Sequence, residues 1–272
     1  IGAYAGDAIT TGSNNISIGY SNLTTLTTGA SNVAVGNDAL EAATTSSNNV
    51  AVGYAALKAT TTGASNVAVG QNALLANTTG SGNTAVGLGA LDASTTGEQN
   101  TGLGSHALGA LTDAQYNVAV GNNALDATTT GDNNVGIGKD ALGANTTASN
   151  NTAVGYTALA TNTTGDNNVA MGSYALDANT TGAQNIGLGV HALGGNTTGA
   201  ANTAIGEDAL KLNTTGGTNA CIGFQAGDNI TTGDGNVLIG AHTGSYDENL
   251  TTGHQNVLIG SYAHTQGTQN KG

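Results

Sequence analysis

A 17-residue repeat runs through almost the whole chain and constrains its fold more than any other feature. One copy occupies residues 32–48 and reads Asn-Val-Ala-Val-Gly-Asn-Asp-Ala-Leu-Glu-Ala-Ala-Thr-Thr-Ser-Ser-Asn. The glycine after the Val-Ala-Val triplet recurs with this period from Gly2 to Gly240, and only the last step, to Gly260, is longer. A short, fixed period of this kind indicates a repeat architecture.

The composition of the repeat selects a β-solenoid, in which each repeat forms one turn, or rung. A helical repeat needs roughly 30 or more residues for a pair of helices. The chain has 44 Gly and no Pro, which suits a backbone whose N–H groups are nearly all bonded to neighbouring rungs. Disorder is the alternative for a polar, Gly-rich chain, but it does not require an apolar residue at the same phase of each repeat. We therefore predict an all-β fold, a parallel β-solenoid of about 16 rungs that forms one continuous domain over residues 1–272, with a three-residue insertion near 245–249.

Two apolar columns of the repeat are candidate core files. The large residue directly before the glycine is predicted to point into the core, while the small residue before it faces outward and permits a close neighbour. A leucine four residues after the glycine closes the core from the second side. The representative members of these columns are Val35, Val52, Val69 and Val86 for the first, and Leu40, Leu57, Leu74 and Leu91 for the second.

Two polar columns are candidate hydrogen-bonded ladders. We expect stacked Asn side chains to bond from rung to rung while tolerating left-handed backbone geometry, and Gly to supply the positive φ angles of the corners. Stacked Thr side chains of the Thr-Thr-Gly segment are expected to stabilise a corner. The representative members are Asn32, Asn49, Asn66 and Asn83, and Thr61, Thr78 and Thr95.

The two ends of the sequence match each other in phase. Asn270, Lys271 and Gly272 stop where the repeat would continue, and Ile1 and Gly2 supply the next positions. We see no polar cap that would close the solenoid. We therefore expect either a filament of head-to-tail copies, in which these residues are the assembly ends, or a longer protein in which this block itself repeats.

The charge balance argues against several classes of partner. The formal net charge is −13, with four Lys and no Arg, so nucleic acid and anionic membranes are unfavourable partners. The sequence contains no run of about 18 apolar residues, which a membrane-spanning helix would require, and no signal peptide is visible. The single Cys221 cannot form an internal disulfide and replaces the usual Ala of its column.

Catalytic and metal-binding patterns are weak, and we expect no enzyme activity and no cofactor. Acidic residues such as Glu41 and Asp92 stand at variable positions typical of a solvated face. His106 and His191 share a column with His242 but lie five rungs apart, about 24 Å at the usual strand spacing, so they cannot share one metal. The carboxylates that precede the Asn column occur in only some rungs and do not form a calcium-binding repeat. They are Asp132, Asp166 and Asp234.

Residues 151–165 carry a resemblance to known repeats. They read Asn-Thr-Ala-Val-Gly-Tyr-Thr-Ala-Leu-Ala-Thr-Asn-Thr-Thr-Gly, which resembles the repeats of phage tail-fibre and related surface proteins. More distantly, residues 32–36 are similar to the head repeats of trimeric autotransporter adhesins, although the repeat here is longer and no stalk or anchor is visible. The resemblance implies a left-handed parallel β-roll, often trimeric, on a fibre outside a cell or virion.

The predicted function is that of an extracellular structural fibre subunit whose main partner is itself, as a head-to-tail filament or a homotrimer. The alternatives are an adhesin that binds cell-surface glycans and an ice-binding solenoid that uses the Thr ladders. Ice binding is disfavoured because adjacent Thr residues of a strand point to opposite faces. Asn-x-Thr sequons, which are glycosylation sites only in a host with that machinery, recur at Asn77, Asn145, Asn162, Asn179, Asn196 and Asn213.

Overall fold

The computed structural model describes residues 1–245 and 250–265, and these form the predicted parallel β-solenoid. The described residues contain 15 strands of three residues each and no α-helix. The chain divides into two compact units, Ile1–Asp140 and Ala141–Gly272. Asn270, Lys271 and Gly272, and residues 246–249 of the predicted insertion, lie outside the described residues.

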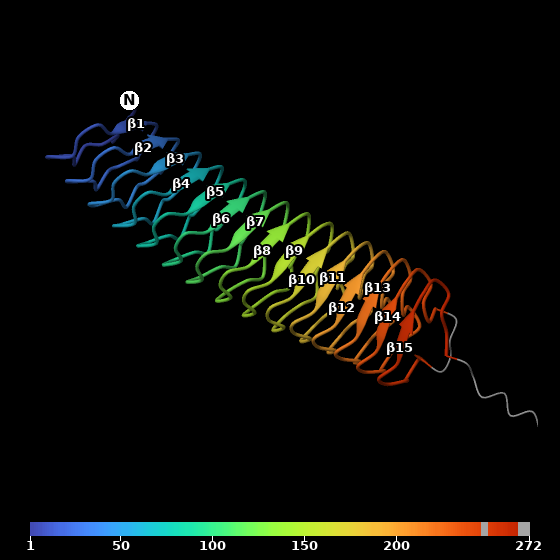
Figure 1. Ribbon diagram of the computed structural model, residues 1–272. Coiled ribbons are helices and arrows are strands. Elements are labelled where there is room, and N and C mark those ends of the chain that lie inside the picture. Colours follow the sequence, from blue (N-terminus) through green and yellow to red (C-terminus); the bar gives the residue numbers. More distant parts are fainter. Residues whose placement is uncertain (246–249, 266–272) are drawn as a thin grey trace, which may run out of the picture. The chain divides into compact units, whose positions relative to one another are not determined.

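The first unit stacks its strands in sequence order, and all of them run in the same direction (Figure 1). Each strand pairs with the next in the register of the repeat, so that Val33 lies beside Val50 and Val35 beside Val52. The strands are β1 (Ile16–Ile18), β2 (Val33–Val35), β3 (Val50–Val52), β4 (Val67–Val69), β5 (Thr84–Val86), β6 (Thr101–Leu103), β7 (Val118–Val120) and β8 (Val135–Ile137).

The second unit has the same construction. Val169 of one rung pairs with Ile186 of the next, again one repeat further along the chain. Only the last pairing, between Val237 and Val257, joins residues that are farther apart in the sequence, and this is the position of the predicted insertion. The strands are β9 (Thr152–Val154), β10 (Val169–Met171), β11 (Ile186–Leu188), β12 (Thr203–Ile205), β13 (Ala220–Ile222), β14 (Val237–Ile239) and β15 (Val257–Ile259).

Hydrogen bonds between rungs extend well beyond the short strands. In the second rung, the backbone N–H of Val33 donates to Asn49 O at 2.8 Å on the strand side. On the other sides, Leu40 N donates to Ala56 O at 3.0 Å, and Thr44 N donates to Thr61 O at 3.0 Å. Backbone ladders on several sides of each rung explain why the chain tolerates no Pro, which has no N–H to donate.

The orientation of the strands contradicts the sequence prediction. The small middle residue of the strand points inward, and Ala34, Ala51 and Ala68 are fully buried. The large residue before the glycine points outward, so Val35, Val52 and Val69 are half-buried and Val86 is exposed. The prediction that this column forms the core is therefore wrong.

The narrow interior explains the reversal. A Cβ atom added to Gly102, at the middle position of β6, would lie 3.1 Å from Ala107 O and 3.4 Å from Leu91 Cδ1. The space opposite each strand is thus already filled by the leucine column, and only Ala, Gly or an occasional larger residue fits between. The larger apolar side chains can only stand on the outer surface.

The leucine column does form the core, as predicted. Leu40, Leu57, Leu74 and Leu91 are fully buried. Their backbone is unexpected, because each adopts a left-handed conformation with φ between 52° and 55°. Burial of a whole leucine side chain, worth about 1.5–3 kcal/mol, offsets the roughly 1–3 kcal/mol cost of this geometry.

The two glycine columns serve different purposes. The glycine after the strand does adopt positive φ, as Gly36 at 131° illustrates. The glycine of Thr-Thr-Gly does not, but a Cβ on Gly63 would lie only 2.4 Å from Gly80 O in the next rung. The expectation that the ladder Asn is itself left-handed is also wrong, because the residue before it, such as Ser31 at 59°, takes that conformation.

Candidate functional site

The predicted Asn column forms a buried ladder along one edge of each unit. Asn66 illustrates the pattern, since its backbone N–H donates to Asn49 Oδ1 at 2.9 Å and its Nδ2 donates to Gly80 O at 2.9 Å. Asn83 N donates in turn to Asn66 Oδ1 at 2.9 Å. The side chains of Asn32, Asn49, Asn66 and Asn83 are fully buried. Each side-chain Oδ1 therefore accepts from a backbone N–H that has no backbone acceptor at the turn before the strand.

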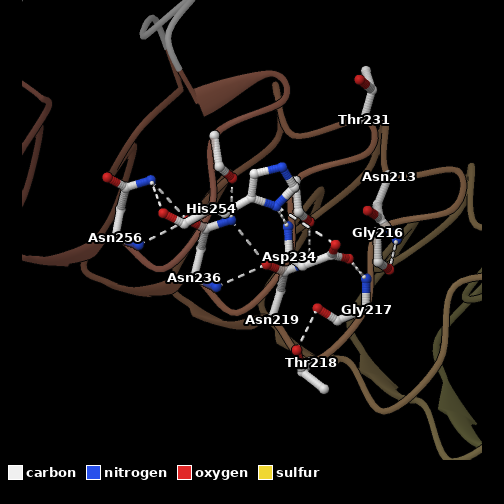
Figure 2. Close-up of polar contacts among 12 residues, drawn as sticks. Asn213, Gly216, Gly217, Thr218, Asn219, Thr231, Asp234, Asn236, His254 and Asn256 are labelled. Atoms are coloured by element: carbon white, nitrogen blue, oxygen red, sulfur yellow. Dashed lines mark hydrogen bonds and ion pairs between the residues drawn. The ribbon is translucent and has the colours of Figure 1, made fainter.

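The ladder continues to the end of the described rungs in the second unit. In Figure 2, Asn219, Asn236 and Asn256 follow one another, with Asn236 N donating to Asn219 Oδ1 at 2.9 Å and Asn256 N donating to Asn236 Oδ1 at 3.0 Å. The same view shows Asp234 Oδ1 accepting from Gly217 N at 2.6 Å, with His254 Nδ1 beside the Asp234 carboxylate at 3.5 Å.

The candidate calcium carboxylates have a structural use that this geometry explains. Asp132 Oδ1 accepts from Gln115 N at 2.7 Å, and Asp166 Oδ1 accepts from Ser149 N at 2.7 Å. Serine performs the same task in other rungs, where Ser81 Oγ accepts from Ala64 N at 3.1 Å. These Asp residues thus bind the preceding rung. Among the described residues, no group of three or more His, Cys, Asp or Glu side chains is placed to hold a metal ion.

A second Asn ladder, which the sequence analysis did not identify, fills the interior of the second unit. Asn179 Nδ2 donates to Asn162 Oδ1 at 2.9 Å, and Asn196 Nδ2 donates to Asn179 Oδ1 at 2.8 Å. The members are fully buried and coincide with sequons, so the folded chain does not present them for glycosylation. The signal for this ladder was the run of Asn at 17-residue spacing from 145 to 213.

The Thr residues of the predicted ladder bind the next rung through backbone carbonyls. Thr61 Oγ1 donates to Thr78 O at 3.1 Å, and Thr78 Oγ1 donates to Thr95 O at 3.0 Å. The second Thr of each pair, such as Thr62 or Thr79, is exposed at the same corner, where the first is only partly buried. The strand alternation on which the disfavouring of ice binding rested does not apply here, because this segment is a bend without strand geometry.

Each of the three His residues of the predicted column has an Asp in the preceding rung, always 14 residues earlier in the sequence. The pairs are Asp92 with His106, Asp177 with His191, and Asp228 with His242. Burial raises the pKa of Asp92 and of Asp177 above the usual 3.8, and the neighbouring His partly opposes this shift. Burial likewise raises the pKa of Asp126. His106 is exposed and the three paired Asp residues are half-buried, so each pair is partly solvated.

Aromatic rings accompany these His residues on the surface of the second unit. Tyr156 and Tyr174 meet edge to face at 5.4 Å, and Tyr174 stacks on His191 at 4.9 Å. Farther along, His242 stacks on Tyr262 at 4.8 Å. Exposed rings beside carboxylates are a surface that can take the apolar face of a polar ligand.

The outward residues of the strands form a repetitive apolar surface on each unit, which we call the sheet face. It consists of the first and third residue of every strand. The third residues Val86, Leu103, Ile137, Met171, Ile205, Ile222 and Ile239 are between 36% and 45% exposed. Contiguous exposed apolar surface of this kind marks an interaction site more often than a solvated one.

Of the predicted assembly ends, only Ile1 and Gly2 belong to the described residues. Ile1 is largely exposed, and Gly2 has the positive φ typical of its column, at 129°. The described residues include no helix that could cross a membrane.

Comparison with known proteins adds no relative. No family model matches this chain, and no curated protein or solved structure matches it either.

Proposed function

We propose that the chain is a non-enzymatic structural element of an extracellular fibre, whose work is to be stiff and chemically inert. The observation that carries this proposal is the redundancy of the links between rungs. At one rung boundary, Val67 N bonds Asn83 O at 2.8 Å, Leu74 N bonds Ala90 O at 3.0 Å, and Asn83 N bonds Asn66 Oδ1 at 2.9 Å. Links at several sides of the rung resist bending and local opening together.

The fibre role is tested by negative-stain electron microscopy of the purified chain over a range of concentrations. We expect long fibres of constant width. Short separate particles at every concentration would contradict the fibre role.

The stiffness is tested by digestion with thermolysin. Trypsin is a poor probe, because the chain has only four Lys and Arg residues together. We expect the native chain to survive far longer than an Asn49→Ala/Asn66→Ala variant, which leaves buried backbone donors unpaired. Equal cleavage rates for both proteins would show that the Asn ladder does not protect the rungs from local opening.

Glycan binding is a second candidate, and the row formed by Tyr156, Tyr174 and His191 favours it. Aromatic faces beside a carboxylate suit the C–H face and hydroxyl groups of a sugar ring. A glycan array should then give specific hits that a Tyr156→Ala/Tyr174→Ala variant loses. Hits that survive the double substitution would assign the binding to another surface.

Ice binding is a third candidate, because both Thr residues of the Thr-Thr-Gly corner reach the surface in successive rungs. Dilute protein should then show thermal hysteresis that a Thr62→Lys/Thr79→Lys variant abolishes. An absence of hysteresis in the native chain would exclude it.

A further inference from the structure

We infer that the sheet face is the surface on which a second copy of this chain packs. The inference deepens the proposed function by naming the surface through which copies meet, and it would also hold for a dimer that forms no fibre. It rests on the composition of the face, its charge, its periodicity and its area.

The sheet face is apolar where a solvated surface would be polar. Its side chains are mostly Val, Ile and Leu, and they point away from an interior that has no room for them. The orientation costs free energy in the isolated chain, because β-branched side chains stay in contact with water. A partner that covers the face would recover this free energy.

The face and its margins are almost free of charge. In each rung the face and its margins span the band from the residue before the ladder Asn to the residue after the glycine, for example residues 31–37. Of the 21 charged residues in the chain, only Lys139 and Glu207 fall within any of these bands. Depletion of charge is the compositional mark of the buried centre of an interface.

The charge elsewhere restricts which surfaces two copies could share. The chain carries a net charge of −13, and every carboxylate except Glu207 lies outside these bands. Two copies would repel each other across surfaces outside the bands, whereas the sheet face lets them approach without bringing like charges together.

The periodicity of the face selects a second solenoid as its occupant. Successive rungs present the same two side-chain positions at about 4.8 Å spacing. A surface that packs into these rows over many rungs must repeat at the same distance. Another copy of this chain has that repeat along its own sheet face.

The area is of the right size for a reversible complex. Strands of three residues, about 10 Å long and about 4.8 Å apart, give about 400 Å² for the eight strands of the first unit and about 340 Å² for the seven of the second. Each face alone is about half of the roughly 800 Å² that one partner contributes to a standard interface, which is the size range of weak, transient contacts.

The first experiment is sedimentation equilibrium of the native chain beside two matched variants. Val69→Lys/Leu103→Lys places two charges on the sheet face of the first unit. Thr62→Lys/Thr96→Lys makes the same change in net charge at two exposed Thr residues of that unit. Thermal unfolding checks that both variants are folded.

We expect the native chain to self-associate, the face variant to raise the dissociation constant at least tenfold, and the Thr variant to leave it within about twofold. A native chain that remains monomeric to about 100 μM, a concentration at which even a weak specific interface would be populated, would overturn the inference. So would equal weakening by both variants.

Disulfide cross-linking provides a second readout. Cysteine is introduced at one sheet-face position at a time, at Val35, Val69, Leu103 or Ile137, with Thr79→Cys as the control. The native Cys221 is buried and does not compete. Cross-linking of every face variant with itself indicates parallel copies in register, and cross-linking only in mixtures of two variants indicates antiparallel copies. No face cross-linking above the Thr79→Cys control would overturn the inference, whatever microscopy shows about fibres.

Discussion

The two units share one backbone design but fill one interior column differently. Seven residues after the strand-ending glycine, the second unit has five Asn in successive rungs, from Asn145 to Asn213. At the same position the first unit has buried residues of mixed type, namely Leu26, Ala43, Thr60, Asn77, Ser94, Leu111 and Thr128.

The comparison shows that a polar side chain in this interior depends on its neighbours along the column. Within the Asn run, each Oδ1 accepts from the Nδ2 of the next rung, as Asn179 Oδ1 does from Asn196 at 2.8 Å. Where the run ends, Asn213 Oδ1 has no hydrogen-bond partner among the described residues, and the next member of the column is Ile230. The isolated Asn77 of the first unit likewise has an unpaired Oδ1 within the described part of the chain. An Asn Oδ1 in this column is thus satisfied only where the next rung also has Asn.

The largest effect is expected from breaking the ladder of the second unit with Asn179→Leu. The change leaves Asn162 Oδ1 and one hydrogen of Asn196 Nδ2 buried without partners. We expect the free energy of unfolding to fall by about 3–5 kcal/mol, measured by chemical denaturation.

The matched control is Asn77→Leu in the first unit. Asn77 Nδ2 donates to Thr60 Oγ1 at 3.2 Å and to Gly80 O at 3.1 Å. Gly80 O keeps its bond from Asn66 Nδ2 at 2.9 Å, so the substitution takes a donor only from the buried Thr60 hydroxyl, and the column already holds Leu111. We expect a loss of about 1–2 kcal/mol. Equal losses at the two sites would show that the ladder has no collective character.

A smaller difference is expected when Asn is added to each unit. Leu26→Asn in the first unit places an amide between Ile9 and Ala43, neither of which has a side-chain partner for it. We expect it to destabilise the chain by about 2–4 kcal/mol.

Ile230→Asn in the second unit removes an apolar side chain of the same size as Leu26. The new Asn can, however, donate from its Nδ2 to the unpaired Asn213 Oδ1. The expected loss is about 1–2 kcal/mol smaller than for Leu26→Asn, in the same denaturation assay. If Ile230→Asn were the more harmful substitution, a neighbouring acceptor would not be what the column requires.

A change in pH should affect both units alike, because it acts on the surface and not on the ladders. Burial raises the pKa of Asp92 and Asp126 in the first unit and of Asp177 and Asp228 in the second above 3.8. The folded state therefore binds these protons more tightly than the unfolded state does. Stability should rise as the pH falls from 7 through the raised pKa values, and the gain should be complete only below about 3.8.

Thermal unfolding between pH 7 and pH 4 measures this effect. Replacing the four Asp residues by Asn should flatten the pH dependence. A Thr62→Ser/Thr96→Ser control, which changes no titratable group, should retain it. If the unfolding temperature of the native chain fell on acidification, the raised pKa values of these four Asp residues would be contradicted.

The smallest effect is expected at Cys221, which stands where most rungs have Ala. Its thiol is fully buried, and burial raises its pKa to about 12. We expect Cys221→Ala to change stability by less than about 1 kcal/mol, and the native thiol to react with Ellman's reagent only after unfolding. Rapid labelling of the folded chain would show that the second unit opens locally.

Much of the fold could be predicted from the repeat alone. The 17-residue period, the absence of Pro and the Asn and Leu columns identified a parallel solenoid, a buried leucine file and a rung-to-rung amide ladder. The sequence shows the second Asn ladder as a run of Asn at the same spacing, but the same residues also match sequons. Its burial depends on where the chain folds back, which the one-dimensional pattern does not contain.

The sequence by itself determined the period, the register and the residues that share a column, because these follow from counting. Only the tertiary structure decided which way each strand faces, and it placed Ala34 inside and Val35 on the half-exposed side. Alternation along a strand says that two neighbours point to opposite sides, but not which side is the interior. The space that Leu40 and its equivalents leave inside the rung admits only small side chains, so the large ones point outward and form the apolar sheet face.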